Sequence, residues 1–225
     1  MKPHVLMMAG WAHPAEALRP LADALAGFAE PRLLAADEAL PKLDAPAFLL
    51  GWSLGGLRIL DAALTAQAPW PGLILIGTTA RFCAATDFPH GVSTARLRAL
   101  KIALRKTPET VLRQFFVDEA APAQLAPAEL EARVQGALAL GADRLAAGLD
   151  ALLTMDLRER LASPTTPVLV LHGRADGVIP CAAGEALAER FVFSRFVGFE
   201  GAGHDLPLRA PEPLVAEIKF FLETF

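Results

Sequence analysis

Cysteine is scarce in this chain of 225 residues, which contains only Cys83 and Cys181. Two cysteines are far too few for the disulfide framework that stabilises many secreted domains. The sequence therefore predicts a protein of the reducing cytoplasm.

An excess of charge of one sign is also missing. The chain has 21 Lys and Arg against 25 Asp and Glu, a net charge of −4, and charged residues make up 20% of it. No global positive field would draw such a chain onto nucleic acid or an anionic membrane surface. We expect neither partner, so a charge-guided partner must recognise a local patch.

Long apolar runs are absent as well. Charged residues or prolines interrupt every Ala/Leu-rich stretch before it reaches the roughly 20 residues that span a bilayer. The apolar run at residues 5–9 is too short for a signal peptide and predicts a strand instead. We therefore expect no transmembrane role.

Apolar residues nevertheless make up 53% of the chain, enough for one domain with a large core and an insertion. Short apolar runs bounded by turn residues predict strands, each buried on both faces, and amphipathic patterns between them predict helices. Strand alternating with helix is typical of the α/β class, with a mainly parallel twisted sheet covered by helices on both faces. The predicted strands are 5–9, 32–36, 47–52, 73–77, 168–172 and 194–199, and the predicted helices are 15–28, 54–67, 184–190 and 211–224.

The alternation stops between residues 81 and 155. This stretch has the pattern of successive amphipathic helices, punctuated by Pro108, Pro122, Pro127 and Gly141. A helical insertion after a sheet strand predicts a lid. We expect a core of residues 1–80 and 156–225 and a helical lid of residues 81–155.

The segment Gly51-Trp52-Ser53-Leu54-Gly55-Gly56 matches the motif G-x-S-x-G. It lies between a predicted strand and a predicted helix, the context in which this motif presents a nucleophilic serine on a sharp turn. Glycines beside the serine leave room for close packing of the helix. Alone, the motif would also fit a purely structural glycine turn.

Two later loops supply the partners of such a serine. Asp176 follows the strand at 168–172, and His204 ends the glycine-rich loop after the strand at 194–199. The chain order Ser53, Asp176, His204 on successive sheet loops is typical of a nucleophile–acid–base triad. Asp205 is the weaker acid candidate, because it directly adjoins the histidine.

The tetrahedral intermediate of acyl transfer needs two backbone N–H donors for its oxyanion. The pattern assigns these to Leu54, which follows the nucleophile, and to Trp11 in the loop after the first strand. No cluster of His, Cys and carboxylates has metal-ligand spacing, and the glycines at 51–56 lack the Lys-Ser/Thr ending of a phosphate-binding loop. We therefore expect no cofactor.

The segments 10–11, 51–56, 154–158 and 173–180 together carry a resemblance to a known family. They are similar to the pimeloyl-carrier-protein methyl ester esterases of biotin synthesis, within the α/β-hydrolase superfamily. The resemblance implies hydrolysis of a methyl ester on an acyl chain tethered to acyl carrier protein, with the carrier recognised by basic lid residues. It also implies activity on small carboxylic esters.

The chain departs from that family in two ways. It is short around the second strand and the lid, and Ala9-Gly10 stands where many relatives have His-Gly. His13 either takes the place of that histidine or faces solvent at the start of a helix, and we favour the solvent-facing position.

Residues 81–113 hold seven basic and two acidic side chains, a local net charge of +5. Arg98, Lys101 and Arg105 are spaced i, i+3 and i+7, so a helix would place them on one face toward an acidic partner. The alternative is an ordinary solvated helix face. Phe115 and other apolar lid residues either line an acyl pocket or pack the lid on the core.

Three functions remain open from the sequence. The first is the carrier-dependent methyl ester esterase, and the second is a broad small-ester carboxylesterase or thioesterase with the same triad. The third is a binding module on a hydrolase fold, whose usual mark is a lost triad residue, and none is lost here. An aspartate nucleophile would be needed for dehalogenase or epoxide hydrolase chemistry, and position 53 is serine.

Overall fold

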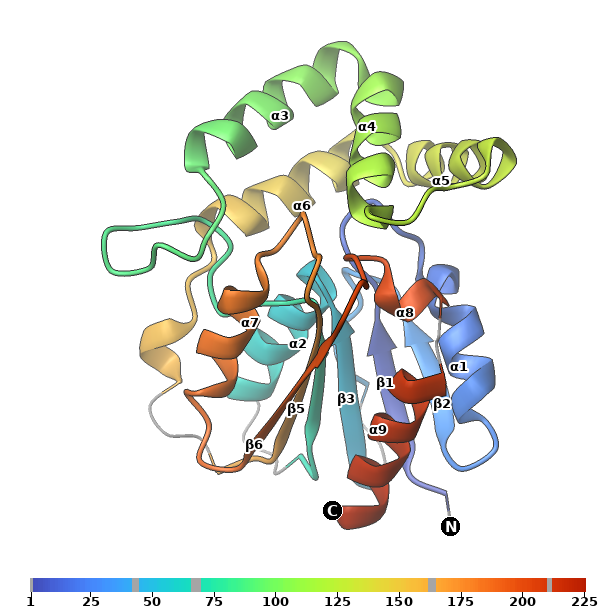
Figure 1. Cartoon of the computed structure of the whole chain (residues 1–225), viewed down its shortest axis with the longest axis vertical. Coiled ribbons are helices and arrows are strands. Elements are labelled where there is room, and N and C mark those ends of the chain that lie inside the picture. Colours follow the sequence, from blue (N-terminus) through green and yellow to red (C-terminus); the bar gives the residue numbers. More distant parts are fainter. Residues whose placement is uncertain (1, 42–44, 66–69, 162–164, 210–211) are drawn as a thin grey trace.

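The computed structural model describes residues 2–41, 45–65, 70–161, 165–209 and 212–225. Within them lies a six-stranded sheet in the order β2-β1-β3-β4-β5-β6, and every neighbouring pair of strands is parallel. Figure 1 shows the sheet with helices on both faces and a further helical layer at one end. The strands are β1 (His4–Met8), β2 (Glu30–Leu34), β3 (Ala47–Trp52), β4 (Leu73–Ile76), β5 (Val168–Gly173) and β6 (Ser194–Phe199).

Strand β1 is the point at which the strand order reverses. It pairs with β2 on one side and with β3 on the other, with Met8 opposite Leu34 and Gly51 respectively. The loops that leave β1 and β3 therefore diverge to opposite sides of the sheet. In open parallel sheets the crevice formed at this position, outside the carboxyl ends of the strands, is the usual place for a ligand site.

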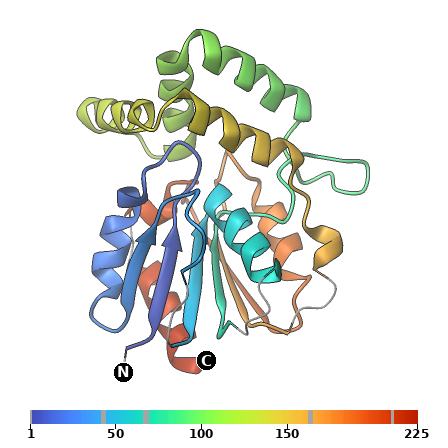
Figure 2. The ribbon, with the colours of Figure 1, turned by 180° about the vertical axis from the view of Figure 1, so that it is seen from behind.

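Alternate strand residues build two separate cores. In β1, Val5 and Met7 pack with α1 (Arg19–Leu25), α8 (Leu206–Arg209) and α9 (Glu212–Thr224). Leu6 and Met8 pack on the opposite face, toward α2 (Leu54–Thr65) and α7 (Cys181–Ala188). Figure 2 shows α2 on the face turned away in Figure 1. The predicted α/β fold with both faces covered is therefore correct.

Several predicted boundaries differ from the structure. The edge strands β2 and β6 are not buried on both faces, because each has a neighbour on one side only. The helix predicted at 15–28 is a short 3-10 turn (η1, Ala15–Leu18) followed by α1, and α7 begins three residues before the predicted 184. Residues 66–67 and 211, predicted as helix ends, lie outside the described residues.

The predicted lid contains four helices: α3 (Thr94–Lys106), α4 (Pro108–Ala120), α5 (Pro127–Ala139) and α6 (Ala142–Thr154). Pro108 and Pro127 occupy the first turns of α4 and α5. The backbone N–H that proline lacks would have no acceptor within the helix at this position, so proline costs no helical hydrogen bond there. Gly141 precedes α6 with φ of 87°. The stretch 81–93 is not helical as predicted; isolated bridges such as Cys83 to Val92 order it instead.

The two ends of this helical segment lie side by side. Arg81 and Asp156 form an antiparallel bridge and an ion pair, and the N–H of Leu157 donates to the carbonyl of Ala80 over 2.9 Å. The segment thus leaves and rejoins the sheet region at one place. It covers the carboxyl end of the sheet, as Figures 1 and 2 show from both sides. No helix among the described residues is long and apolar enough to cross a bilayer.

The close packing of α2 on β1 yields a test of the fold. A Cβ on Gly55 would lie 2.3 Å from the carbonyl oxygen of Met8, which is backbone and cannot move aside cheaply. Gly55→Ala should destabilise the protein by about 3 kcal/mol or more, measured by urea unfolding. Gly136→Ala is the control: its Cβ would meet nothing within 4 Å in α5, so stability should rise by about 0.5–1 kcal/mol. Equal stability of the two variants would contradict this packing.

Candidate active site

The turn between β3 and α2 is sharp and strained. Ser53 has φ of 56°, in the left-handed region that a residue with a side chain rarely adopts. Its N–H donates to the carbonyl of Ile76 over 2.9 Å, and its own carbonyl accepts from the hydroxyl of Thr78 over 2.7 Å. These two hydrogen bonds fix the serine backbone, and the turn lifts the side chain above the end of the sheet.

Glycines make this turn possible. A Cβ on Gly51 would lie 2.4 Å from the Cα of Gly56, and a Cβ on Gly56 would lie 2.7 Å from the side chain of Thr78. A larger residue at Gly51 would force the start of α2 away from β3, and one at Gly56 would force α2 away from Thr78, which follows β4. The G-x-S-x-G pattern therefore has a steric basis in this fold.

Three side chains from three loops meet above the sheet. Nε2 of His204 lies 2.8 Å from Oγ of Ser53, and Nδ1 of the same ring lies 2.6 Å from Oδ2 of Asp176. These partners assign the tautomer: the Nδ1–H donates to the carboxylate, and Nε2 accepts from the hydroxyl. The structure thus brings together the three residues predicted as nucleophile, acid and base.

Asp176 is buried but satisfied on both oxygens. Oδ1 accepts the N–H groups of Val178 and Ile179, each over 2.8 Å, and Oδ2 faces the rings of His204 and His172. Burial alone would raise the pKa of Asp176, but the charge of His204 and the hydrogen bonds from both histidines outweigh it. The pKa of the carboxyl lies well below its usual value.

His172 supports the carboxylate from below. Its Nε2 lies 3.0 Å from the carbonyl of Ile179 and 3.3 Å from Oδ2 of Asp176, so both neighbours are acceptors and Nε2 carries the proton. Its buried Nδ1 has no partner among the described residues. A Cβ on Gly184 would lie 2.3 Å from that nitrogen, so α7 packs directly on the ring and fixes its orientation.

His204 is buried, and opposing effects act on its protonation. Burial lowers the pKa of His204, whereas the charge and hydrogen bond of Asp176 and the nearby carboxylates of Glu119 and Asp205 raise it; the net pKa is above the ordinary 6.5. Gly77, with φ of 50°, makes room for the pair, because a Cβ there would lie 3.3 Å from Nδ1 of His204.

The loop after β1 lies directly against Ser53. A Cβ on Gly10 would lie 3.0 Å from the Cβ of Ser53, and the next residues include Ala12 in a left-handed conformation, φ 62°. Within the described part of the chain, the N–H groups of Trp11 and Leu54 have no hydrogen-bond acceptor. Two free donors beside a serine hydroxyl are the arrangement that an oxyanion hole requires.

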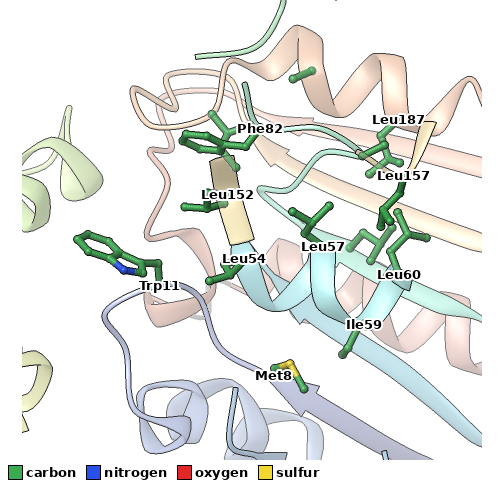
Figure 3. Packing of buried hydrophobic residues seen from close by; sticks show 14 of the residues in the cluster. Met8, Trp11, Leu54, Leu57, Ile59, Leu60, Phe82, Leu152, Leu157 and Leu187 are labelled. Carbon is green, nitrogen blue, oxygen red and sulfur yellow. The ribbon is translucent and has the colours of Figure 1, made fainter. Parts of the chain in front are cut away.

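Helix α6 of the predicted lid covers this loop. The indole N–H of Trp11 donates to the carbonyl of Leu145 over 2.8 Å, and a Cβ on Gly148 would lie 2.5 Å from the same ring. Figure 3 shows Trp11 and Leu54 beside Leu152 of α6 within one apolar cluster. Phe115 of α4 stacks edge-on against Trp11 with ring centroids 4.8 Å apart.

Little open space reaches the serine. Ser53 is 7% exposed, and the pocket beside Gly10 and Leu54 has a volume of about 20 Å³, roughly room for one water molecule. A larger apolar pocket of about 280 Å³ lies against Phe193 and Phe220, at the opposite end of the sheet from Ser53. The side chain of Ser53 is therefore almost closed off from solvent by the helices above it.

The predicted basic face is partly neutralised. Lys101 pairs with Asp150 of α6, whereas Arg98 and Arg105 are exposed and have no ion pair among the described residues. Other basic residues of the segment also have carboxylate partners, such as Arg113 with Glu109 and Glu131. Among the basic residues of 81–113, those without an ion pair in the described part of the chain, Arg98, Arg105 and Lys106, therefore all lie on α3.

Two expectations about histidine and acid candidates have clear outcomes. His13 does not face solvent as predicted: it is 6% exposed, and its Nε2 lies 2.8 Å from Oε1 of Glu119. Asp205 does not reach the ring of His204, because its carboxylate binds Arg133 and Arg209. Sequence reasoning missed Glu119 and Arg133, whose only signal was an acid and a base among apolar helix residues.

Groups of side chains able to hold a metal ion are absent from the described ranges.

Comparisons of the chain with known proteins identify its family. A family model described as serine aminopeptidase, S33, matches residues 33–208. A pimeloyl-[acyl-carrier protein] methyl ester esterase of Aromatoleum aromaticum is 33% identical over 184 residues, covering 78% of this chain and 74% of that protein. One of the same name from Vibrio campbellii is 27% identical and covers 97% of this chain and 83% of its own.

Solved structures agree on the fold. An esterase from Exiguobacterium antarcticum has a TM-score of 0.88 at 21% identity, covering 98% of this chain and 92% of that one. A bromoperoxidase from Bacillus anthracis has a TM-score of 0.86 at 18% identity, covering 99% and 92%. The fold and these relatives define a hydrolase of the α/β-hydrolase class that acts on ester bonds. Within that class, the chain belongs to the serine aminopeptidase S33 family.

The protonation of His204 can be measured directly. The imidazole should titrate above pH 6.5 in NMR spectra recorded against pH, because Asp176 stabilises its charged form. In Asp176→Asn the neutral amide no longer does so, and the midpoint should fall. An unchanged midpoint would mean that the carboxylate does not control the ring.

Proposed function

We propose that the chain hydrolyses carboxylic esters through an acyl-serine intermediate on Ser53. The observation that carries this proposal is the position of the His204 ring, 2.8 Å from the hydroxyl of Ser53 and 2.6 Å from the carboxylate of Asp176. Since Nδ1–H is bound to the carboxylate, Nε2 has its lone pair free to accept the serine proton.

In the first half-reaction Oγ of Ser53 bonds to the ester carbonyl carbon while its proton passes to Nε2 of His204. The carbonyl π electrons move to oxygen, and the N–H groups of Trp11 and Leu54 stabilise the resulting oxyanion. The intermediate then collapses, the C–O bond to the alcohol breaks, and the alcohol takes the proton from His204. The acyl group remains on Ser53.

In the second half-reaction water replaces the alcohol. His204 accepts a proton from water as the oxygen bonds to the acyl carbon, and the second oxyanion uses the same two N–H donors. Collapse breaks the bond to Oγ, returns the proton to Ser53 and releases the acid. Throughout, Asp176 stays ionised and stabilises the imidazolium, in line with its low pKa.

For the substrate, we propose the methyl ester of a pimeloyl chain on acyl carrier protein, handled in the cytoplasm, with residues 81–155 as the lid over the acyl chain. The names of the relatives support this assignment. Helix α3 adds a physical argument. Arg98, Ile102 and Arg105 are spaced i, i+4 and i+7, and all three are exposed, with Ile102 at 59%. A basic stripe around an apolar side chain suits an acidic partner helix.

The reaction is tested by comparing Ser53→Ala with the wild type on p-nitrophenyl butyrate and on methyl-pimeloyl carrier protein. The variant should lose at least about 10³-fold in kcat. In the wild type kcat/KM should rise with pH through a midpoint above 6.5, because His204 must be neutral to accept the proton and its pKa is raised. Preference for the free ester would indicate a general carboxylesterase, and activity retained without Ser53 would overturn the mechanism.

Docking of the carrier on α3 is tested with the double variant Arg98→Ala/Arg105→Ala. The KM for the carrier-bound ester should rise about tenfold at low salt, while kinetics on p-nitrophenyl butyrate stay unchanged. High salt should remove the difference, because exposed charges are screened. Lys219→Ala, which removes a charge from α9 far from α3, is the matched control and should leave both KM values unchanged. A double variant that matches this control would exclude α3 as the docking face.

A further inference from the structure

Glu119 of α4 is a carboxylate with no exposure to solvent. Both of its oxygens have partners: Oε1 lies 2.8 Å from Nε2 of His13, and Oε2 lies 3.1 Å from Nη1 of Arg133. Burying a charge costs several kcal/mol before its partners compensate, and an apolar residue of similar volume is often no less stable. Stability alone therefore does not explain an acid at this position.

The main chain of the same residue contacts the loop that carries the base. The carbonyl of Glu119 accepts the N–H groups of both His204, over 3.0 Å, and Asp205, over 3.2 Å. Because α4 ends at Ala120, this carbonyl is among the last four of the helix, which lack partners inside it. The end of a helix from residues 81–155 thus binds the backbone of His204 directly.

We call this contact, between the end of α4 and the loop of His204, the joint. Other residues bring its two sides close together. A Cβ on Gly203 would lie 2.1 Å from the carbonyl oxygen of Ala121, so only glycine allows the loop to approach α4 this closely. On the far side, the indole N–H of Trp52 donates to the carbonyl of His204 over 2.9 Å. The ring of His13 packs against Trp52 at a tilt of 51°, with centroids 4.6 Å apart. Glu119, through His13, therefore reaches the residue that binds His204 from below.

Charged groups face this joint from every element packed around it. The loop after β5 contributes Asp176, α4 contributes Glu119, and α5 contributes Arg133. The loop of His204 itself contributes Asp205, whose carboxylate binds Arg133 over 3.3 Å and Arg209 of α8 over 2.9 Å. Glu119 and Arg133 thus connect α4 and α5 to the loop of His204 by a buried chain of ion pairs.

We propose that Glu119 is a positioning residue for the hydrolytic reaction: from α4 it fixes the loop of His204, and so the place of the imidazole ring, through its main chain and through His13 and Arg133. This proposal rests on the proposed function, in which His204 is the base. The seating of α4 on the core is then a condition for a correctly placed base. Consistent with it, the charge of Glu119 is among the causes that raise the pKa of His204.

The test is Glu119→Gln, which keeps the shape of the side chain and removes its charge. With p-nitrophenyl butyrate, kcat should fall about tenfold while KM changes by less than about threefold, because the base is misplaced and not the substrate. The midpoint of the acid limb of kcat/KM should also move to lower pH. A variant that loses packing alone would not shift this midpoint.

Glu129→Gln is the matched control. Glu129 also lies in the helical segment and pairs with Arg133 over 2.7 Å, but it is solvent-exposed and contacts neither His13 nor the loop of His204. This variant should keep both kcat and the pH midpoint of the wild type. The same values in Glu119→Gln would overturn the proposal, as would an equal shift in both variants.

Two further measurements keep the outcome decisive. NMR titration of His204 in Ser53→Ala, with and without Glu119→Gln, needs no turnover. A midpoint lowered by Glu119→Gln, together with a wild-type protein that hydrolyses neither ester, contradicts the proposed function alone. An unshifted midpoint in an active enzyme contradicts this inference alone. If Glu119→Gln does not fold, Glu119→Asp replaces it. Its shorter carboxylate cannot bind both partners, so kcat should fall several-fold at constant KM, and an unchanged kcat would overturn the proposal.

Discussion

The contact between the start of α2 and the end of β1 is the constraint on which the rest of the site depends. Gly55 lies so close to the carbonyls of Met8 and Ala9 that no side chain fits between them. This packing forces the chain to turn sharply at Ser53 and supports its left-handed backbone. At the reversal of strand order the loop after β1 also lies against this turn, where a Cβ on Gly10 would lie 3.0 Å from the Cβ of Ser53.

Around this turn, the buried carboxylates of Asp176 and Glu119 each have polar partners. The carboxylate of Asp176 accepts two backbone N–H groups and faces the rings of His172 and His204, and the carboxylate of Glu119 pairs with the partly buried Arg133. Each group would destabilise the fold if left alone in the interior, so each fixes the position of its partner. His204 lies between the two sets, with its ring bound to the first and its backbone to the second.

The sequence was sufficient for the features that depend on local pattern. The strands at 47–52 and 194–199, the sharp turn at Ser53 and the order of Asp176 and His204 follow from apolar runs and glycine spacing, and the structure has them. The contacts of Glu119 with His13 and with Arg133 were not predictable, because the paired residues lie 106 and 14 positions apart in the chain and meet only through tertiary packing. For the same reason the charge of Lys101 looked free, since its partner Asp150 lies on another helix.

The joint between α4 and the loop of His204 bears on how such enzymes can be recombined. Because Arg81 and Asp156 bring its two ends together, the segment 81–155 suits exchange between homologues as one piece. However, the acceptor for the backbone N–H of His204, the carbonyl of Glu119, belongs to this segment, and the matching glycine, Gly203, lies outside it. A chimera that exchanges the segment 81–155 without the loop of Gly203 and His204 would lose the fit between the end of α4 and this loop, although each part comes from a folded protein. The segment 81–155 and the loop of His204 therefore have to be exchanged together.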